Sequence, residues 1–289
     1  YYVQGATIAP MPTGTSMSLH DALAVMLIPS ASNYAEALSS RIFGSQSAFL
    51  DATREWLASH GLTGTTVAEP TGISPRNTST PDDLLAIAKL AAANPAIAQI
   101  VATSSVTIPG AGPLYNTNGL LGTAGITGLK TGNLGMGTHN LLYTATLDVG
   151  AAAPLAVTGV VLGGASRESV NATVIAALDS IRSGFHQVPV ATGGQEIGSI
   201  STPWGGAATL VIDESASIFT WSDTPIEVTM DIETPPTYRD GTTVGTITWT
   251  AGPNTVTVPV RIAGTIDPPT EWWRLTHPSE LGSVMDAGS

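Results

Sequence analysis

The 289-residue sequence predicts an α+β domain followed by a small all-β domain. Helix patterns come first, strand patterns rich in β-branched residues follow from residue 104, and a long helix pattern ends near residue 185. Beyond Gln187 the helix signals stop and only alternating strand patterns remain. Because 43% of the residues are apolar and only 11% are charged, the chain can bury a sizeable core.

Four helices are expected in the first hundred residues, at 18–28, around 37–38, at 45–60 and at 80–93. Ser18 is a suitable N-cap, with Asp21 three residues further on. Thr80 is followed by a proline and two acidic residues, which favour the positive end of a helix. Pro95 ends the last of these helix patterns.

Four strands and a closing helix complete the first domain. The strands are expected at Ser104–Ile108, Ile126–Lys130, Asn140–Leu147 and Leu155–Leu162. The helix, Arg167–Phe185, carries an apolar face that includes Val170, Val174 and Leu178. Helices, then antiparallel strands, then a final helix are typical of an α+β domain.

The second part of the chain alternates apolar and polar residues in the manner of β-strands. These strands are expected at Thr209–Ile212, Ile226–Ile232, Val244–Thr250 and Thr255–Ile262. They define a small β domain within residues 189–265, followed by a tail at 266–289. The tail carries Trp272 and Trp273, a pair that suits a peripheral membrane contact, a partner surface, or packing against the β domain.

Composition excludes several classes of function. A net charge of -12 repels polyanions, so we expect no nucleic-acid partner. The absence of cysteine excludes thiolate nucleophiles, and the five histidines lack the close pairing of a metal site. We therefore expect neither a metal nor another cofactor. No stretch of about 18 apolar residues is present to span a bilayer.

Lys130 is one of only two lysines in the chain and lies between Gly128 and Gly132. Thr131 follows it directly, at the end of a predicted strand. Glycines allow a ligand to come close to the backbone, and a lysine beside a hydroxyl favours an anion. The segment therefore predicts an anion-binding strand edge.

Several segments together resemble the serine D-alanyl-D-alanine carboxypeptidases, the low-molecular-mass penicillin-binding proteins of actinobacterial type. The matching segments are Pro29–Leu38, Gly61–Thr63 with Pro70–Ile73, Asn118–Leu121, Gly128–Gly132, Gly163–Glu168 and Trp272–Pro278. The resemblance covers nearly the whole chain. It implies a β-lactamase/transpeptidase-like catalytic domain at 1–188, an antiparallel sheet with helices, before the small β domain.

The resemblance also implies roles for the residues around the Lys-Thr-Gly motif. Lys130 and Thr131 would bind the substrate's terminal carboxylate, and Gly132 would let its backbone come close. The N–H of Asn133 would form half of the oxyanion hole, and Arg167 would add a second cation. Arg167 could instead be a solvated residue at a helix start.

Ser30 corresponds to the serine of the family's Ser-x-Asn motif, which relays protons. Its third position is Ser32 here, which puts the binding of the substrate amide in question, and Asn33 follows it. A plain alternative for Ser30 is that it caps the next helix. Asn118 borders the expected cleft, although it could instead tie a turn to the strand.

The family's nucleophile lies in Ser-x-x-Lys, and this sequence has no such motif. The residues three before the two lysines are Ala86 and Thr127. Only 29 residues precede Ser30, whereas the family's nucleophile lies several tens of residues upstream. We therefore expect an N-terminal truncation, an apolar groove beside the Ser18 and Thr80 helices, and no activity from this chain alone.

The family's substrate is a peptidoglycan stem peptide ending in D-Ala-D-Ala, and β-lactams inhibit its full-length members. An extracytoplasmic, secreted or envelope-associated location follows from that substrate. Two alternatives remain open. A β-lactamase on the same fold would need a deacylating glutamate, but neither Glu55 nor Glu69 has the expected surroundings. A non-catalytic peptidoglycan-binding homologue would have kept the carboxylate site and lost the nucleophile.

Overall fold

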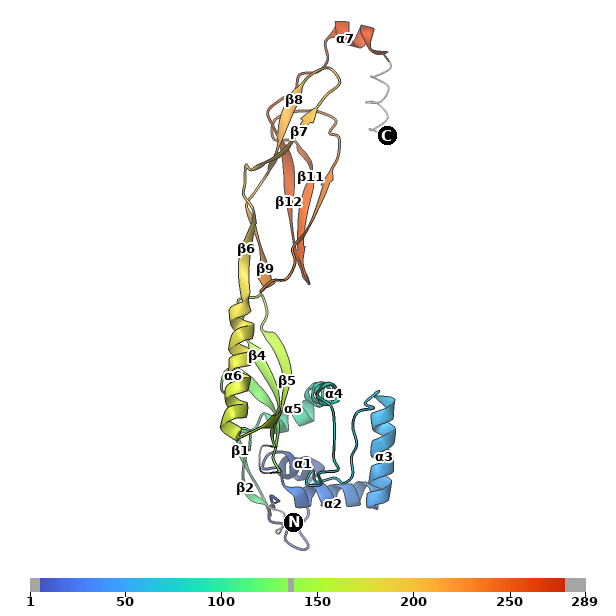
Figure 1. Cartoon of the computed structure of the whole chain (residues 1–289), viewed down its shortest axis with the longest axis vertical. Coiled ribbons are helices and arrows are strands. Elements are labelled where there is room, and N and C mark those ends of the chain that lie inside the picture. Colours follow the sequence, from blue (N-terminus) through green and yellow to red (C-terminus); the bar gives the residue numbers. More distant parts are fainter. Residues whose placement is uncertain (1–5, 135–137, 279–289) are drawn as a thin grey trace. The chain divides into compact units, whose positions relative to one another are not determined.

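The computed structural model describes residues 6–134 and 138–278 (Figure 1). The chain divides into two compact units, Tyr1–Arg182 and Ser183–Ser289. Sequence patterns placed the division at residue 188. The division falls earlier because strand β6 (Phe185–Ala191) pairs with β9 (Ala216–Trp221) of the second unit.

Five helices open unit 1: α1 (Leu19–Leu27), α2 (Ser32–Phe43), α3 (Gln46–Ser59), α4 (Pro81–Ala93) and α5 (Pro95–Val101). Side-chain oxygens of Ser18 and Thr80 accept hydrogen bonds from the first turns of α1 and α4, as predicted. Helix α5 was not predicted. Asn94 ends α4 and also caps α5, because its side chain accepts hydrogen bonds from the next turn.

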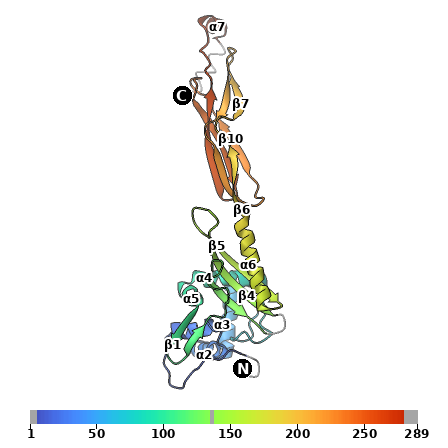
Figure 2. The same ribbon diagram turned by 90° about the vertical axis from the view of Figure 1, so that its left-hand side faces the viewer.

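An antiparallel three-stranded sheet forms the centre of unit 1, in the order β3 (Ile126–Gly132), β4 (His139–Leu147) and β5 (Leu155–Gly164). Helix α6 (Arg167–Gly184) packs on one face of this sheet (Figure 2). Helices α4 and α5 pack on the other face, through Ala88 and Val101 against Leu129. A hairpin of β1 (Ser105–Ile108) and β2 (Gly112–Tyr115) lies beside α1.

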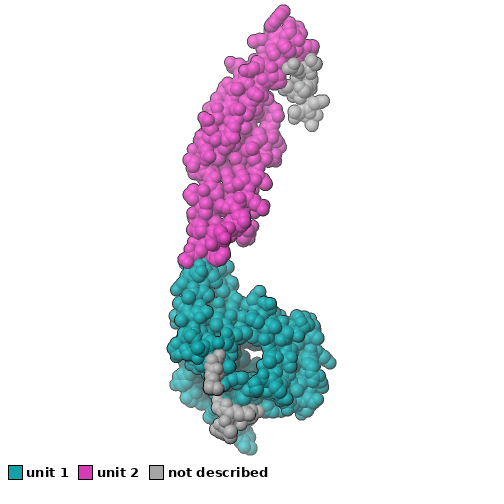
Figure 3. All heavy atoms as spheres, viewed as in Figure 1, with its two compact units in different colours: residues 1–182 teal, residues 183–289 magenta. Residues whose placement is uncertain are grey.

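Helix α4 is apolar but poorly covered. Only Ala88 of its thirteen residues is fully buried, and Leu90 is 41% exposed. Figure 3 shows a hollow in the surface of unit 1. The expected apolar groove on the sheet side of the Ser18 and Thr80 helices stays a prediction. Among the described residues, no single helix is long and apolar enough to cross a membrane. Helices α4 and α5 reach the required length and apolarity only when taken together, and the pair is bent by 100°.

Unit 2 consists mainly of β-strands, as the sequence predicted for residues 189–265. A five-stranded antiparallel sheet has the order β10 (Glu227–Ile232), β11 (Thr243–Ala251), β12 (Asn254–Ala263), β8 (Ala207–Ile212) and β7 (Glu196–Ser201). The β6–β9 pair belongs to the same hydrophobic core. Its centre is formed by Ile218, Val260 and Ile262, which are at most 2% exposed.

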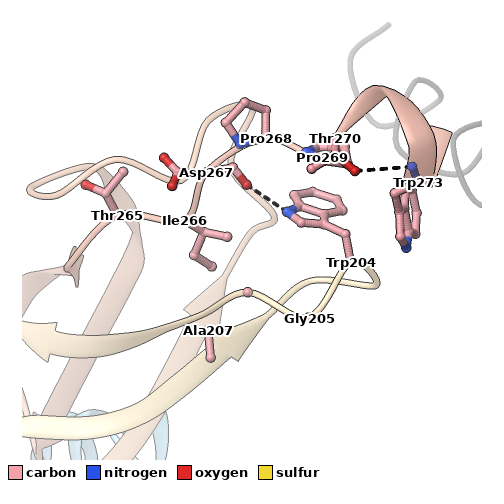
Figure 4. Close-up of a pocket in the computed structure, with 11 residues that line it drawn as sticks. Trp204, Gly205, Ala207, Thr265, Ile266, Asp267, Pro268, Pro269, Thr270 and Trp273 are labelled. Carbon is pink, nitrogen blue, oxygen red and sulfur yellow. Dashed lines mark hydrogen bonds between the residues drawn. The ribbon is translucent and has the colours of Figure 1, made fainter.

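A short helix, α7 (Glu271–Thr276), is attached to unit 2 by an aromatic contact (Figure 4). The ring of Trp273 meets that of Trp204 edge to face, with centroids 5.9 Å apart. The indole N–H of Trp204 donates a hydrogen bond of 2.8 Å to the carbonyl of Asp267. One tail tryptophan therefore packs against the β domain, while Trp272 is 75% exposed.

Gly125 supplies a first testable prediction, with Gly122 as its control. Both have φ of +80°, but an added Cβ at Gly125 would overlap the backbone carbonyl of Thr146, whereas Gly122 faces open space. Gly122→Ala should cost about 1 kcal/mol from backbone strain alone. Gly125→Ala should cost roughly 3 kcal/mol or more, because the strand must also shift. Urea unfolding of both variants checks this, and equal losses would contradict the predicted overlap.

Candidate active site

Ser30 lies in the break between α1 and α2, in an unusual backbone conformation. Its φ is +65°, a left-handed value that a non-glycine residue adopts only when its surroundings hold it there. The N-cap of α2 is Ala31, and no side chain caps that helix. Ser30 therefore does not cap α2, and its hydroxyl is free to face another element.

The partner of Ser30 is Lys130, 100 residues away in sequence. The Nζ of Lys130 donates a hydrogen bond of 2.7 Å to the Ser30 Oγ and another of 2.9 Å to the carbonyl of Thr131. The lysine is half-buried, and burial lowers its pKa from 10.5 to about 8. The structure thus brings together the two residues that the sequence proposed for catalysis.

A cleft of about 210 Å³ opens beside this pair. Its lining includes most of the residues predicted from the sequence: Ser30, Thr131, Gly132, Asn133 and Arg167. Arg167 is the first residue of α6 and is exposed. Its position therefore fits both a second cation for the ligand and a solvated residue at a helix start. Arg167 and several hydroxyl groups line this cleft, and the ammonium of Lys130 lies against one of them, that of Ser30. Such an arrangement suits a carboxylate ligand.

Two predicted substrate-binding residues lie elsewhere. Asn118 is only 4% exposed, and its amide donates to the carbonyl of Gly128 and accepts from the N–H of Leu120. It therefore ties the turn to β3, which is the alternative that the sequence left open, and a contact of Asn118 with substrate stays a prediction. Ser32 is 6% exposed at the start of α2 and is not among the residues that line the cleft, so its contact with substrate also stays a prediction.

Asn33 does not replace the missing amide of the Ser-x-Asn motif. Its side chain accepts a hydrogen bond from the N–H of Ala9 and donates one of 2.9 Å to the carbonyl of the same residue. The backbone N–H of Ser32 likewise donates to the carbonyl of Thr7. The N-terminal segment is therefore bound along the start of α2, and it places Thr7 in the cleft lining.

Sequence reasoning missed other lining residues: Thr7, Thr117, His139, Asn140 and Asn171. Thr117 has the most direct connection to the motif, because its Oγ1 lies 2.7 Å from the Oγ1 of Thr131. Its position between Asn116 and Asn118, in a polar run ahead of β3, was the available signal. His139 begins β4 next to the end of β3, and register alone would have placed it there.

Comparisons with known proteins agree with this geometry. The sequence profile of the D-alanyl-D-alanine carboxypeptidase family matches residues 3–165. A comparison with curated proteins finds no match. The structure is similar to penicillin binding protein 5 from Haemophilus influenzae, with a TM-score of 0.58 and 18% identity over 92% of this chain and 80% of that one.

Two further solved structures match a smaller share of the chain. A mutant of the Streptomyces K15 DD-transpeptidase is 26% identical, with a TM-score of 0.53, over 61% of this chain and 74% of that one. Penicillin-Binding Protein D2 from Listeria monocytogenes, solved in an ampicillin-bound form, is 24% identical, with a TM-score of 0.52, over 60% and 72% of the two chains.

The chain therefore has a penicillin-binding, transpeptidase-like fold, and the Lys-Thr-Gly segment lies at the end of β3 beside the cleft. The chain belongs to the D-alanyl-D-alanine carboxypeptidase family, whose profile matches more than half of its length. That membership supports the function of a serine-type D-Ala-D-Ala carboxypeptidase. The 289 residues hold the Ser30 and Lys130 motifs of the site and no Ser-x-x-Lys.

Proposed function

We propose that the cleft binds the C-terminal carboxylate of a peptidoglycan stem peptide ending in D-Ala-D-Ala. The hydrogen bond of 2.7 Å between Lys130 Nζ and Ser30 Oγ carries this proposal, because it fixes a cation and a hydroxyl at one end of the cleft. Lys130 and Arg167 supply positive charge, and Thr131 supplies a hydroxyl donor. Ser30 is the group that relays a proton between the nucleophile region and the leaving amine.

The backbone beyond the motif completes the proposed site. Gly132 and Asn133 are exposed at the end of β3 and line the cleft, so a peptide can lie alongside them. The N–H of Asn133 is the proposed oxyanion donor, because it lies on the same strand edge as the carboxylate-binding groups. The complete reaction needs a nucleophile that these residues do not supply.

Titration with acetylated D-Ala-D-Ala tests this proposal. We expect saturable chemical-shift changes at Thr131 and Asn133, and much weaker binding of the matching C-terminal carboxamide, which lacks the charge. A chain that binds both peptides equally would contradict carboxylate recognition. The D-Ala-L-Ala peptide is a stereochemical control that keeps the charge.

Binding should weaken as pH rises through about 8. The pKa of Lys130 is lowered to about 8, so its positive charge is present below that pH and is lost above it. A bound carboxylate stabilises the ammonium, so the complex titrates at a higher pH than the free protein. The dissociation constant should rise by up to about tenfold per pH unit between the two pKa values.

Peptide affinities measured between pH 7 and 10 check this dependence. The Lys130→Arg variant is the control, because arginine stays charged over that range while His139 and Arg167 are kept. A wild-type affinity that is constant through pH 8 would show that the Lys130 charge does not contact the ligand.

A β-lactamase activity is not favoured, because the carboxylate of Glu69 accepts hydrogen bonds from residues of its own loop. Burial alone would raise the pKa of its carboxyl, but hydrogen bonds from Thr71, Ser74 and Asn77 outweigh burial and lower the pKa. Such a carboxylate is a weak base. Glu69 also lies outside the cleft lining, so it is not placed to activate a water there.

A non-catalytic peptidoglycan-binding protein is the second candidate, because Lys130, Ser30 and Thr131 could bind a carboxylate without any catalytic step. The genomic sequence upstream of this chain separates the two candidates. An in-frame Ser-x-x-Lys, several tens of residues before Ser30, supports the enzyme. A reading frame that begins close to Tyr1 supports the binding protein.

We also propose an extracytoplasmic location and a peripheral membrane contact through α7. The substrate class supports the location, and protease treatment of intact cells tests it. Two large apolar residues of α7, Trp272 and Leu275, are 75% and 76% exposed, while Trp273 is packed against Trp204. Tryptophan and leucine held outward in this way suit the interface of a lipid bilayer.

Vesicle sedimentation tests the membrane contact. Wild-type protein should sediment with phosphatidylcholine vesicles, and the double variant Trp272→Ser/Leu275→Ser should stay in solution. Trp56→Ser is the matched control, because Trp56 is 42% exposed on α3 in the other unit. Equal sedimentation of the double variant and the control would contradict the proposal.

A further inference from the structure

Thr117 is a cleft residue whose surroundings are held in place from both sides. The side chain of Asn116 donates to the carbonyls of Val101 and Thr103. The side chain of Asn118 donates to the carbonyl of Gly128. Thr117 lies between these two fixed residues, so its own side chain has little freedom to move away from the cleft.

Thr117 also links the two halves of the site. Its backbone N–H donates a hydrogen bond of 3.2 Å to the carbonyl of Ile28, two residues before Ser30. Its Oγ1 lies 2.7 Å from the Oγ1 of Thr131 on β3. One residue thus contacts both the segment that carries Ser30 and the strand that carries Lys130.

The direction of the Thr117–Thr131 hydrogen bond decides what Thr131 can offer a ligand. A hydroxyl group has one hydrogen and two lone pairs. When Thr117 donates to Thr131, the hydrogen of Thr131 is free to point into the cleft. A carboxylate can only accept hydrogen bonds, so a bound carboxylate selects this direction. Hydrogen bonds that run in one direction also polarise and strengthen one another.

We propose that Thr117 is a positioning residue that orients the Thr131 hydroxyl as a donor toward the ligand. Its contribution to binding passes through Thr131, and Thr117 itself does not contact the carboxylate. This inference rests on the proposed function, because the ligand is the same D-Ala-D-Ala terminus. It adds a residue outside the Lys-Thr-Gly motif to the recognition of that terminus.

A double-mutant cycle tests the proposal, with acetylated D-Ala-D-Ala as the probe and calorimetry as the measurement. Thr117→Val keeps the shape and removes the hydroxyl, and it should weaken binding roughly 3- to 10-fold. Thr131→Val should weaken binding at least as much. The double variant should bind no more weakly than Thr131→Val alone, because Thr117 has no other route to the ligand.

Two further variants guard against a folding effect. Thr117→Ser keeps the hydroxyl and should restore binding to within about twofold of the wild type. Thr127→Val removes a comparable hydroxyl pair, because Thr127 Oγ1 lies 2.9 Å from Thr144 Oγ1 on the same sheet but outside the cleft. It should leave binding unchanged. Thermal unfolding of each variant confirms that the compared proteins are folded.

The outcomes separate the inference from the function on which it rests. Wild-type protein that does not bind the probe overturns the proposed function and this inference together. Wild-type binding with an unchanged Thr117→Val variant overturns the role of Thr117 alone. Losses that multiply in the double variant also overturn it, because Thr117 would then act independently of Thr131.

Discussion

Replacing Lys130 by methionine is expected to remove peptide binding and to leave the fold as stable or more stable. Methionine has a similar length and no charge, so the ammonium that faces Ser30 is lost while the space stays filled. Loss of one member of a close charge pair weakens binding by about 2–5 kcal/mol, which is roughly 30-fold to several thousand-fold.

The opposite sign for stability follows from the lowered pKa of Lys130. Burial disfavours the charged form of Lys130. At pH 7 the charged lysine therefore has a higher free energy in the folded state than in the unfolded state, where water solvates it. Removing the charge removes that penalty, on the order of 1 kcal/mol after allowance for solvent at the cleft. The lost hydrogen bond to Ser30 offsets part of the gain.

Lys89→Met is the matched control, because Lys89 is the other lysine in the chain and is exposed on α4. It should change neither peptide affinity nor the unfolding temperature. Calorimetry and thermal unfolding of both variants give the answer. A Lys130→Met protein that unfolds at a lower temperature and still binds peptide would make Lys130 a structural residue.

Much of the fold could be predicted because the main elements carry strong local signals. The caps at Ser18 and Thr80 and the alternation in β11 and β12 are examples of patterns that survive in the folded chain. The missed elements carried contrary signals. Pro95 looked like the end of a helix and instead begins α5, because Asn94 serves both ends.

Strand β6 was not predicted, and the domain boundary was placed inside it, at residue 188. Pro189 is tolerated in this strand, since β6 belongs to a two-stranded sheet in which an N–H facing away from its partner is not needed. Strand β2 begins with glycine and proline and is only four residues long. It is too short to show the alternation of apolar and polar residues by which a strand is recognised.

The site was predictable where a motif defines it and not where only tertiary contacts do. Lys130 and Ser30 were paired by resemblance, and no local pattern could have shown that residues 100 positions apart share a hydrogen bond of 2.7 Å. Ser32 and Asn33 illustrate the limit. Whether their side chains face the cleft depends on the N-terminal segment, which binds Asn33 through Ala9.

This 289-residue chain is expected to form no covalent adduct with a fluorescent penicillin, despite its carboxypeptidase fold. The residues three before its lysines are Ala86 and Thr127, and the Thr127 hydroxyl pairs with Thr144. Removing the nucleophile of a serine hydrolase lowers kcat by roughly 10⁶. Gel fluorescence after incubation should therefore show no band above that of heat-denatured protein.

Ser30 makes the experiment sharper, because its hydroxyl lies in the cleft beside Lys130, whose pKa is lowered to about 8. Penicillin-Binding Protein D2 from Listeria monocytogenes, solved with ampicillin, is the positive control for labelling. A labelled band from this chain that disappears in Ser30→Ala would mean that Ser30 is itself acylated. The proton-relay role would then be wrong, and Ser30 with Lys130 would be a nucleophile and its base.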